Sequence, residues 1–484
     1  MGETPPGARE PLDGETLDPA RVARIAAEGG RADLTRGARE RNEQAARLAD
    51  DLVSRGESLY GRNTGVGALL RERVEPVDAG DHSRRLLRSH AGGAGEVASI
   101  ERARALMVVR ANQLGAGGGG VSSSLHEAIV RALNAGVAPA VHRIGSIGTG
   151  DLTALAELGL ALAGEGRWLG HAHPPEPVDI APGDAIALMS SGAATLGEAA
   201  LASDELKRLL AGAEITAGLT FTAARANPAA LDPRVHAARP HPGQVAVARR
   251  LAELVGAAMP ARSQDPVSLR SIPQVQGAAR DAADELGRVL QVELNAAAEN
   301  PLLDVEVGRA LSNGNFHLAR LALVLDQVRA SLVQAAAQSV RRVAALCDER
   351  VTGLSAFLAG EDAPGSSGAM ILEYTASAAL EELRAAAAPA TFAPPVLAHG
   401  QEDHASLAPQ AARGLSRALE HYTTVVAVEL VAAVRALRLA SHRPASAAGE
   451  RAYDAAASTL PTRMEDRDLS RDIAAAADHL TSGG

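Results

Sequence analysis

The sequence predicts an all-α fold in which long helices pack side by side. After Asn315, apolar residues recur in alternating steps of three and four, the spacing of a helix that buries one side in a bundle. These residues are Leu318, Leu321, Leu325, Val328 and Leu332. From about residue 183 onward the chain is rich in alanine and helical in pattern, and alternating apolar and polar strand patterns are almost absent.

The chain divides by composition into four regions. Residues 1–30 are rich in Pro, Gly, Glu and Arg and are expected to form a poorly ordered tail. Residues 31–200 combine short helices with glycine-rich loops, which suggests loops that converge on a site. Residues 201–450 are predicted to form the central long-helix bundle, and residues 451–484 a helical C-terminal tail.

Two boundaries inside the bundle are predicted from local signals. A long helix is expected over about 276–298, closed by Asn300-Pro301, because proline disfavours helix in the residue before it. Glycine, proline and serine gather in 354–370, which predicts a loop between bundle helices.

The composition argues against several classes of protein. Acidic residues outnumber basic ones, 58 to 48, so no basic surface for nucleic acid or anionic membrane is expected. The single cysteine, Cys347, excludes an internal disulfide framework and a cysteine-rich metal site. The most apolar long segment, Tyr422–Ala440, contains charged residues, and the N-terminus lacks a signal pattern. We therefore expect a soluble, cytoplasmic protein.

The single lysine, Lys207, lies in a charged helix pattern typical of a solvated face, so Schiff-base chemistry is not expected.

Two glycine-rich loops are candidate site elements. The loop 145–152, Gly-Ser-Ile-Gly-Thr-Gly-Asp-Leu, could let its backbone approach a ligand, although a tight turn explains it equally well. In the loop 60–67, Tyr60 precedes three glycines and could be held over a ligand by a mobile lid. A base role requires its pKa, normally near 10, to be lowered, and a cation such as Arg62 could do so. The alternative is a buried tyrosine that caps a turn.

Three further strings carry polar residues typical of a substrate pocket. Ser89 and His90 precede a flexible glycine-rich loop, although a lone histidine is more often structural. Arg270 ends the string Gln-Asp-Pro-Val-Ser-Leu-Arg, and its planar fork could bind a carboxylate bidentately or form a structural ion pair. Glu402 lies in Gln-Glu-Asp-His; a metal site there is disfavoured, because adjacent residues on one helix do not face one point.

These strings together resemble the histidine and phenylalanine ammonia-lyase family, which includes aminomutases. In its cofactor loop, Gly-Ser-Val-Gly-Ala-Ser-Gly-Asp-Leu, the Ala-Ser-Gly tripeptide cyclises into an electrophilic methylidene-imidazolone (MIO). Here Gly148, Thr149 and Gly150 stand in its place, so one residue is missing and the serine is absent. The matching strings cover about residues 55–410, in order.

The resemblance implies roles for individual residues. Tyr60 corresponds to the catalytic base on the lid, Arg270 to the clamp on the substrate carboxylate, and Glu402 to a residue facing the polar ring of the substrate. Should Tyr60 not be the base, His90 is the next candidate. The predicted catalytic residues are Tyr60, His90, Thr149 and Ser190. The predicted substrate-binding residues are Asn63, Ser89, Arg270, Asn295, Phe316 and Glu402.

Three departures from the family pattern all touch the prosthetic group or its reaction. They are the shortened loop, Ser190 where an asparagine holds the cofactor carbonyl, and Val267 where a tyrosine assists catalysis. We therefore predict that Gly148, Thr149 and Gly150 remain an ordinary peptide, and that the protein uses neither MIO nor a metal.

The functional expectation is a lyase-family enzyme that abstracts a proton without MIO and performs elimination, addition or cyclisation. Its substrate would be a small amino-acid-like or polar-ring carboxylate. Two alternatives remain open: an ammonia-lyase or aminomutase whose MIO forms from Gly148-Thr149-Gly150, and a catalytically inactive scaffold. Because family members form two-fold symmetric tetramers with sites built from several chains, the resemblance also implies a homotetramer with shared active sites.

Overall fold

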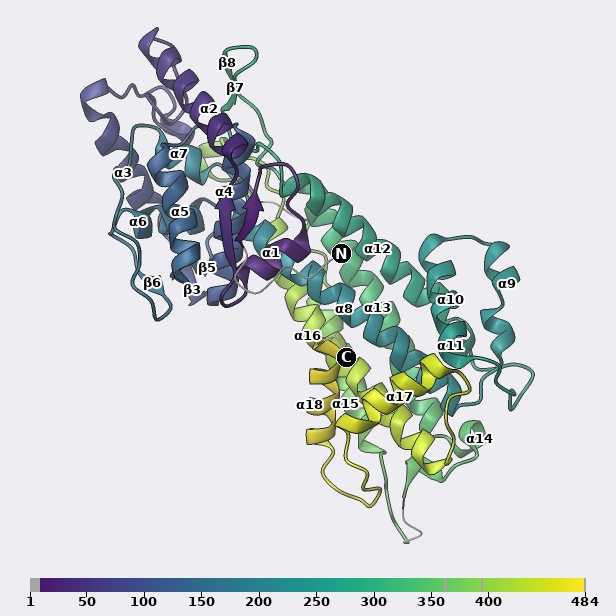
Figure 1. Cartoon of the computed structure of the whole chain (residues 1–484). Helices are drawn as coiled ribbons and strands as arrows, with labels where there is room; N and C mark the ends of the chain where they lie inside the picture. The colour runs from purple at the N-terminus through teal and green to yellow at the C-terminus, as the bar shows by residue number, and fades with distance from the viewer. Residues whose placement is uncertain (1–8, 361–363, 393–394, 483–484) are drawn as a thin grey trace. The chain divides into compact units, whose positions relative to one another are not determined.

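The computed structural model describes residues 9–360, 364–392 and 395–482, and it divides into two compact units. Unit 1 comprises the residues up to Asp204, Gly287–Leu325 and Pro389–Arg413; unit 2 comprises Glu205–Leu286, Asp326–Ala388 and Gly414–Gly484. The all-α prediction is confirmed (Figure 1). Four long helices contribute residues to both units: α8 (Ala193–Ala223), α12 (Ile272–Glu293), α13 (Ala319–Cys347) and α16 (Ala408–Leu439).

Unit 1 is built around α4 (Ile100–Ala116), which is buried along most of its length. It packs against α1 (Pro19–Ala26), α2 (Arg36–Ser54) and α5 (Ser123–Ala135) (Figure 1). The buried Arg104 of α4 donates hydrogen bonds to carbonyl oxygens at the ends of α1 and α5, at 2.8–2.9 Å, which satisfies its charge without an acidic partner. The other helical elements of this unit are α3 (Ala79–His90), α6 (Leu152–Leu162), α7 (Asp184–Met189), η1 (Gly67–Leu69), η2 (Pro76–Asp78) and η5 (Ala398–Gly400).

Among the described residues, strands occur only as four short two-stranded sheets. They are β1 (Arg9–Leu12) with β2 (Arg31–Leu34), β3 (Ala94–Val97) with β5 (His142–Ile144), β4 (Ala138–Pro139) with β6 (Trp168–Leu169), and β7 (Leu302–Asp304) with β8 (Arg309–Leu311). Only the first pair is parallel. The β3–β5 pair matters most for the site, because it lays the chain after His90 beside the chain that leads into the loop 145–152.

The region predicted as a poorly ordered tail is structured where it is described. Residues 9–12 form β1 and residues 19–26 form α1, while Leu12, Leu17 and Ile25 are fully buried. The expectation is therefore wrong for residues 9–30, because the apolar side chains of α1 fall on one face; residues 1–8 lie outside the described part. The two units also cut the chain differently from the predicted boundaries at 200 and 450.

The apolar repeat after Asn315 forms the buried side of α13, as predicted, with Leu321, Leu325, Val328 and Leu332 at 0% exposure. The helix predicted over 276–298 instead spans Ile272–Glu293. It ends before the predicted proline signal, with Asn295 just beyond it bonded to the backbone of Leu17. The predicted loop 354–370 contains the turn η4 (Ala356–Leu358), and residues 361–363 lie outside the described part.

In unit 2, a buried polar cluster joins three of the long helices. Arg342 of α13 forms hydrogen bonds of 2.6 and 2.7 Å with Glu429 of α16, and Thr220 of α8 donates to the same carboxylate at 2.8 Å. Both charged side chains are 1% exposed. The other helical elements here are η3 (Pro228–Leu231), α9 (Pro233–Ala237), α10 (Pro242–Val255), α11 (Val267–Arg270), α14 (Glu349–Thr352), α15 (Ile371–Ala386), α17 (Ala447–Thr459) and α18 (Ser470–Thr481).

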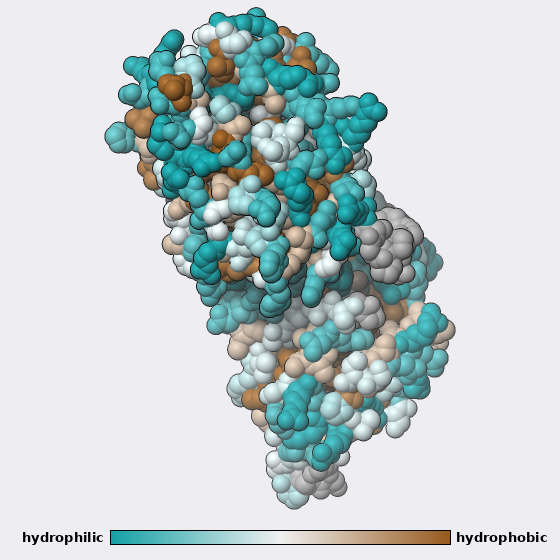
Figure 2. All heavy atoms as spheres, turned by 60° about the vertical axis from the view of Figure 1, so that its left-hand side comes forward, coloured by the Kyte–Doolittle hydropathy of each residue, from teal (hydrophilic) through white to brown (hydrophobic). Residues whose placement is uncertain are grey.

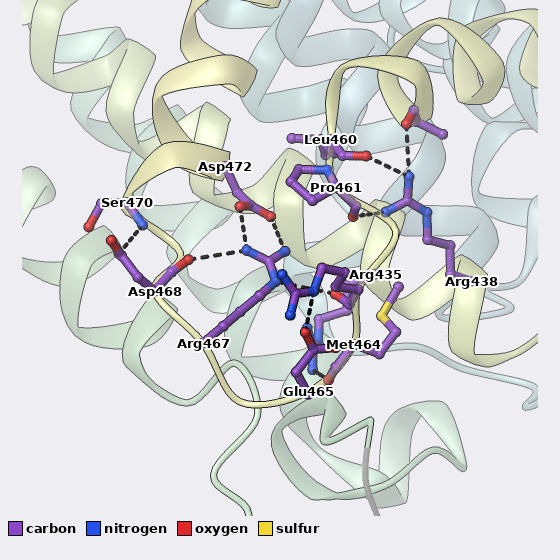
Figure 3. Close-up of polar contacts among 12 residues, drawn as sticks. Arg435, Arg438, Leu460, Pro461, Met464, Glu465, Arg467, Asp468, Ser470 and Asp472 are labelled. Atoms are coloured by element: carbon purple, nitrogen blue, oxygen red, sulfur yellow. Dashed lines mark hydrogen bonds and ion pairs between the residues drawn. The ribbon is translucent and has the colours of Figure 1, made fainter.

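Arginines of α16 hold the connection between α17 and α18 in place (Figure 3). Arg438 donates to the carbonyl oxygens of Leu460 and Pro461 at 3.0 and 2.5 Å, and Arg435 donates to that of Met464 at 2.5 Å. These carbonyls lie outside any helix or strand ladder, and the guanidinium groups supply their hydrogen-bond partners. The predicted C-terminal helical tail is therefore bonded to the bundle of unit 2.

Within the described residues, one helical stretch, Asp184–Ala223, could cross a membrane by length and composition alone; the segment Tyr422–Ala440, which the sequence analysis set aside, is not among such stretches. Since 78% of the most apolar window of Asp184–Ala223 is buried inside the protein, this stretch also fits a core helix, which passes the same test. On the face shown in Figure 2, hydrophobic residues lie in separate patches among hydrophilic ones rather than in one continuous band.

Candidate active site

The loop 145–152 connects β5 to α6 and is held by the segment 401–407. The Ser406 hydroxyl donates to the Gly148 carbonyl oxygen at 3.0 Å, and the Leu407 N–H donates to the Ile147 carbonyl oxygen at 2.9 Å. Gly148 has φ of 98°, and a Cβ at this position would collide with Ser406. Only glycine suits both the conformation and the close contact, so the glycine-rich pattern serves a close approach of two backbones.

A buried carboxylate fixes the end of this loop. Asp151 accepts hydrogen bonds from the N–H and the hydroxyl of Thr195 at 2.7 and 2.9 Å, and its own N–H donates to the Ser191 carbonyl oxygen at 2.7 Å. Burial raises the pKa of Asp151, which the hydrogen bonds from Thr195 oppose. Its position after the last loop glycine was visible in the sequence, but its partner in α8 was not.

Three predicted site residues form one cluster in unit 1. The Thr149 hydroxyl lies close enough to Glu402 to lower the pKa of its carboxyl group. Tyr60 lies close enough to Glu402 for that charge to act on its pKa, and the Tyr60 hydroxyl accepts a hydrogen bond of 2.7 Å from the Gly67 N–H. The lid loop, the loop 145–152 and the segment after η5 therefore meet at these side chains.

The electrostatics of Tyr60 differ from the expectation. Burial raises its pKa, and the negative charge of Glu402 raises it further, while the hydrogen bond from Gly67 lowers it. Arg62 does not act on the phenol as proposed, because it forms an ion pair of 2.7 Å with Asp50. Tyr60 is thus a neutral phenol near pH 7, and it can act as a base only when a positive group approaches it.

Glu402 shares this environment. Burial raises the pKa of its carboxyl group, the neighbouring Asp403 raises it further, and the hydrogen bond from Thr149 lowers it. Its segment is a loop rather than the helix that the metal argument assumed. Over the described part of the chain, no group of three His, Cys, Asp or Glu side chains is placed to hold a metal ion.

His90 and Ser89 lie in the last turn of α3. The Nδ1 atom of His90 is 2.8 Å from the Leu86 carbonyl oxygen, so Nδ1 carries the proton and Nε2 is left as an acceptor. The Ser89 hydroxyl donates to the same carbonyl at 3.1 Å. Within the described ranges, no hydrogen bond joins His90 to Tyr60 or Glu402; the sheet β3–β5 only brings its loop beside the loop 145–152.

Two predicted substrate-binding asparagines form hydrogen bonds within the protein. The Asn295 oxygen accepts from Leu17 N–H and from the Asn112 amide, and its NH₂ group donates to the Leu17 and Gln291 carbonyl oxygens, at 2.8–3.0 Å. These four bonds use its full capacity, so none remains for a substrate. The Asn63 side chain accepts from Leu59 N–H and donates to the Glu57 carbonyl oxygen, which shapes the lid.

Ser190 is also engaged by the protein. Its hydroxyl oxygen accepts a hydrogen bond of 2.8 Å from the Asn300 N–H, and its side chain is 7% exposed. The adjacent Glu299 forms a fully buried ion pair of 2.8 Å with Arg110, and burial raises the pKa of this glutamate. Sequence reasoning noted Glu299 only as part of a motif, since its partner lies far away in the chain.

The remaining predicted residues are placed as follows. Phe316 is half-buried in unit 1 and precedes His317, which is hydrogen-bonded to His404 on the Glu402 segment. Arg270 belongs to unit 2, where it ends α11 and is exposed, with no ion pair among the residues that the structure describes. The structural ion pair considered as an alternative for Arg270 is therefore not found there. Val267, at the start of α11, is 61% exposed.

Comparison with known proteins identifies the family to which the chain belongs. The model of the family described as aromatic amino acid lyase matches residues 17–458. The chain belongs to this family. It is 36% identical to the histidine ammonia-lyase of Anaeromyxobacter sp. (strain K), over 98% of both chains. It is 37% identical to that of Streptomyces coelicolor, over 96% of this chain and 94% of the relative.

Several solved structures share the fold of this chain. The ergothioneine-degrading enzyme ergothionase of Treponema denticola has a TM-score of 0.92 at 25% identity, covering 98% of this chain and 99% of that one. The tyrosine aminomutase of Streptomyces globisporus has a TM-score of 0.91 at 28% identity, covering 98% and 97%. The chain is thus a lyase of a family whose fold supports more than one reaction, so its own reaction must be argued from its site.

Proposed function

We propose that this lyase works without MIO, on a small carboxylate substrate that already carries a good leaving group. The observation that carries the proposal is the loop itself, in which Thr149 alone stands between Gly148 and Gly150. In the family pattern, Ala-Ser-Gly supplies the atoms of the prosthetic group at this place.

The residues present fit an MIO group poorly. An alkene formed by dehydration of threonine would carry a methyl group that the serine-derived one lacks. The hydroxyl to be lost lies beside Glu402, and the loop is one residue shorter than the family pattern. Ser190 replaces the asparagine that would hold the cofactor carbonyl, and its hydroxyl offers a single donor on a shorter side chain.

Without an electrophile, the substrate must supply its own activation. Tyr60, once deprotonated, would take a proton from the carbon next to the one that bears the leaving group. The electrons of that C–H bond then form the double bond, and the leaving group departs with its bonding pair. A cationic nitrogen suits this reaction, because it leaves as a neutral amine.

The charges around Tyr60 support a cationic leaving group. Glu402 holds a negative charge near the phenol and raises the pKa of Tyr60. A cation bound between the two side chains would neutralise this effect and favour the phenolate. Because one structural neighbour degrades ergothioneine, a betaine with a quaternary nitrogen, betaines are the first compounds to test.

A second candidate function is an ammonia-lyase whose MIO forms from Gly148-Thr149-Gly150. The identity of 36–37% to histidine ammonia-lyases, over nearly the whole chain, favours it. Incubation with histidine and with ergothioneine, followed by absorbance of the unsaturated product, separates the two candidates. We expect turnover of the betaine and none of histidine; the reverse result supports the second candidate.

Intact-mass spectrometry tests the loop directly. We expect the purified protein to have the mass of its unmodified sequence, because the loop lacks the serine and one residue of the cyclising tripeptide. A Thr149→Ala variant serves as the control and should differ only by the mass of the substitution. Cyclisation would be shown by a wild-type mass that is lower than its sequence mass by two water molecules, together with a Thr149→Ala variant that has its full sequence mass.

Arg270 is proposed to bind the substrate carboxylate. Arg270→Lys keeps the charge but loses the planar fork, so one hydrogen bond to a charged group disappears. We expect KM to rise roughly tenfold to a hundredfold, the equivalent of about 1.5–3 kcal/mol, with kcat changed much less. A drop in kcat at unchanged KM would contradict a role in binding.

The proposed assembly is a homotetramer with shared sites. Arg270 has no ion pair among the described residues and is exposed, as expected of a side chain that completes a site on another chain. Light scattering coupled to size-exclusion chromatography should give four times the chain mass of 49.6 kDa. A monomer at micromolar concentration would contradict both the tetramer and the shared site.

A further inference from the structure

A pair of histidines joins two segments that carry predicted substrate-binding residues. The Nε2 atom of His317 lies 2.9 Å from the Nδ1 atom of His404, and the rings stack with centroids 5.1 Å apart and an angle of 27° between planes. His317 follows Phe316 directly, and His404 lies two residues after Glu402. Nothing in the proposed elimination uses either ring.

The segment that carries Glu402 needs such outside support. Ala398, His399 and Leu407 have φ of 50°, 57° and 54°, a left-handed conformation that is unfavourable for residues with a side chain. Ser406 and Leu407 bond the far end of the segment to the loop 145–152. The histidine pair supplies a further attachment, to the chain that leads into α13.

We propose that the His317–His404 pair is a proton-sensitive clamp that positions the Glu402 segment against the Phe316 segment. The inference rests on the proposed function in one respect, namely that Glu402 and Phe316 contact the substrate. The two histidines are positioning residues, since they act through the residues beside them.

The protonation states of the pair decide whether the clamp is closed. In the neutral pair, one ring nitrogen donates its N–H and the other accepts; a pair with one added proton still offers one acceptor. When both rings are protonated, all four nitrogens are donors, so the hydrogen bond is lost and two positive charges face each other.

The charges around the pair set the direction of the pH effect. Burial lowers the pKa of His317, and the charge of His404 lowers it further. Glu402 and Asp403 lie on the segment of His404, with Tyr60 facing Glu402 from the lid, and Arg320 follows His317 on α13. Because the folded protein binds the second proton less readily than the unfolded chain, the clamp is closed above the ordinary histidine pKa. It opens as the pH falls below that value.

Hydrogen exchange of the segment 397–407 as a function of pH tests the clamp without any assay of activity. The amides of Leu397 and Leu407 are hydrogen-bonded to Glu402 and Ile147 and report closure. After correction for intrinsic exchange, we expect wild-type protection to fall about tenfold below roughly pH 6. His442→Asn, at an exposed histidine of unit 2, is the control and should behave as the wild type.

Matched variants separate titration from packing. Asn at 404 and Gln at 317 place an amide near the bonded ring nitrogen, so His404→Asn and His317→Gln should keep protection but lose its pH dependence. His404→Ala and His317→Ala should lose about tenfold in protection at every pH, the scale of one hydrogen bond. Full protection in the alanine variants, or an unchanged pH dependence in the amide variants, would overturn the proposal.

A kinetic measurement adds the link to function once a substrate is identified. The alanine variants should raise KM about tenfold with a smaller change in kcat, and the amide variants should restore KM. If the exchange results hold while KM stays unchanged, the clamp exists but Glu402 and Phe316 do not bind the substrate. That outcome counts against the proposed function rather than against the clamp.

Discussion

Replacing Tyr60 with phenylalanine is expected to lower turnover by roughly two to four orders of magnitude, the usual contribution of a general base. The substitution removes the hydroxyl that would accept the proton and leaves the ring. The hydroxyl makes one hydrogen bond within the lid, from the Gly67 N–H, so the thermal stability should change little. Steady-state kinetics on the identified substrate and a thermal unfolding curve test both statements.

The pH profile of the same variant adds a sharper test. Because burial and Glu402 raise the pKa of Tyr60 above its ordinary value, kcat/KM of the free wild-type enzyme should increase with pH up to the alkaline range. Tyr60→Phe should lose this rise. Tyr374→Phe, at a tyrosine of α15 that is 66% exposed, is the matched control and should leave the profile unchanged. Near-normal turnover of the Tyr60 variant would require another base, and His90, with its Nε2 free to accept, is the next candidate.

Removing one partner of the buried pair Arg342–Glu429 is expected to lower the free energy of unfolding by about 3–5 kcal/mol. Glu429→Leu leaves the Arg342 guanidinium, which is 1% exposed, without its carboxylate. It also leaves the Thr220 hydroxyl without its acceptor. Denaturant unfolding followed by circular dichroism, at one fixed protein concentration, measures the change.

Two control variants test whether the fall in the free energy of unfolding comes from the uncompensated buried charge. The double variant Arg342→Met with Glu429→Leu removes both charges, so it should recover most of the stability that the single variant loses. Arg443→Ala breaks an ion pair of 2.6 Å with Asp454 whose side chains are 52% and 60% exposed. We expect it to change the free energy of unfolding by less than about 1 kcal/mol. A double variant as unstable as Glu429→Leu would mean that the loss comes from packing rather than from the uncompensated charge.

Local patterns were sufficient for the fold class and for the main site loops. The three- and four-residue spacing of Leu321, Leu325 and Val328 requires a helix with one buried side, and all three are fully buried in α13. The glycines around Thr149 left open whether the loop approaches a ligand or forms a tight turn, and in the structure Gly148 lies against Ser406 of the same chain.

Motif matching was weaker for the roles of single polar residues. Asn295 occurs in a string that the family uses in its site, yet its amide is saturated by Leu17, Asn112 and Gln291. Leu17 and Asn112 lie 278 and 183 positions away from Asn295 in the sequence, so no local pattern could show these contacts. The same holds for α1, where composition suggested disorder and tertiary packing against α4 supplied the order.

The sequence by itself determined the helical architecture, the family and the positions of the lid and the shortened loop, because these follow from periodicity and from residues adjacent in the chain. Only the tertiary structure decided how the side chains act on one another. It buried Tyr60 and placed Glu402 near it, so that the pKa of the phenol is raised where the sequence suggested the opposite. It also joined His317 to His404 across 87 positions. Burial and charge act through space, and the distances that set them exist only in the folded chain.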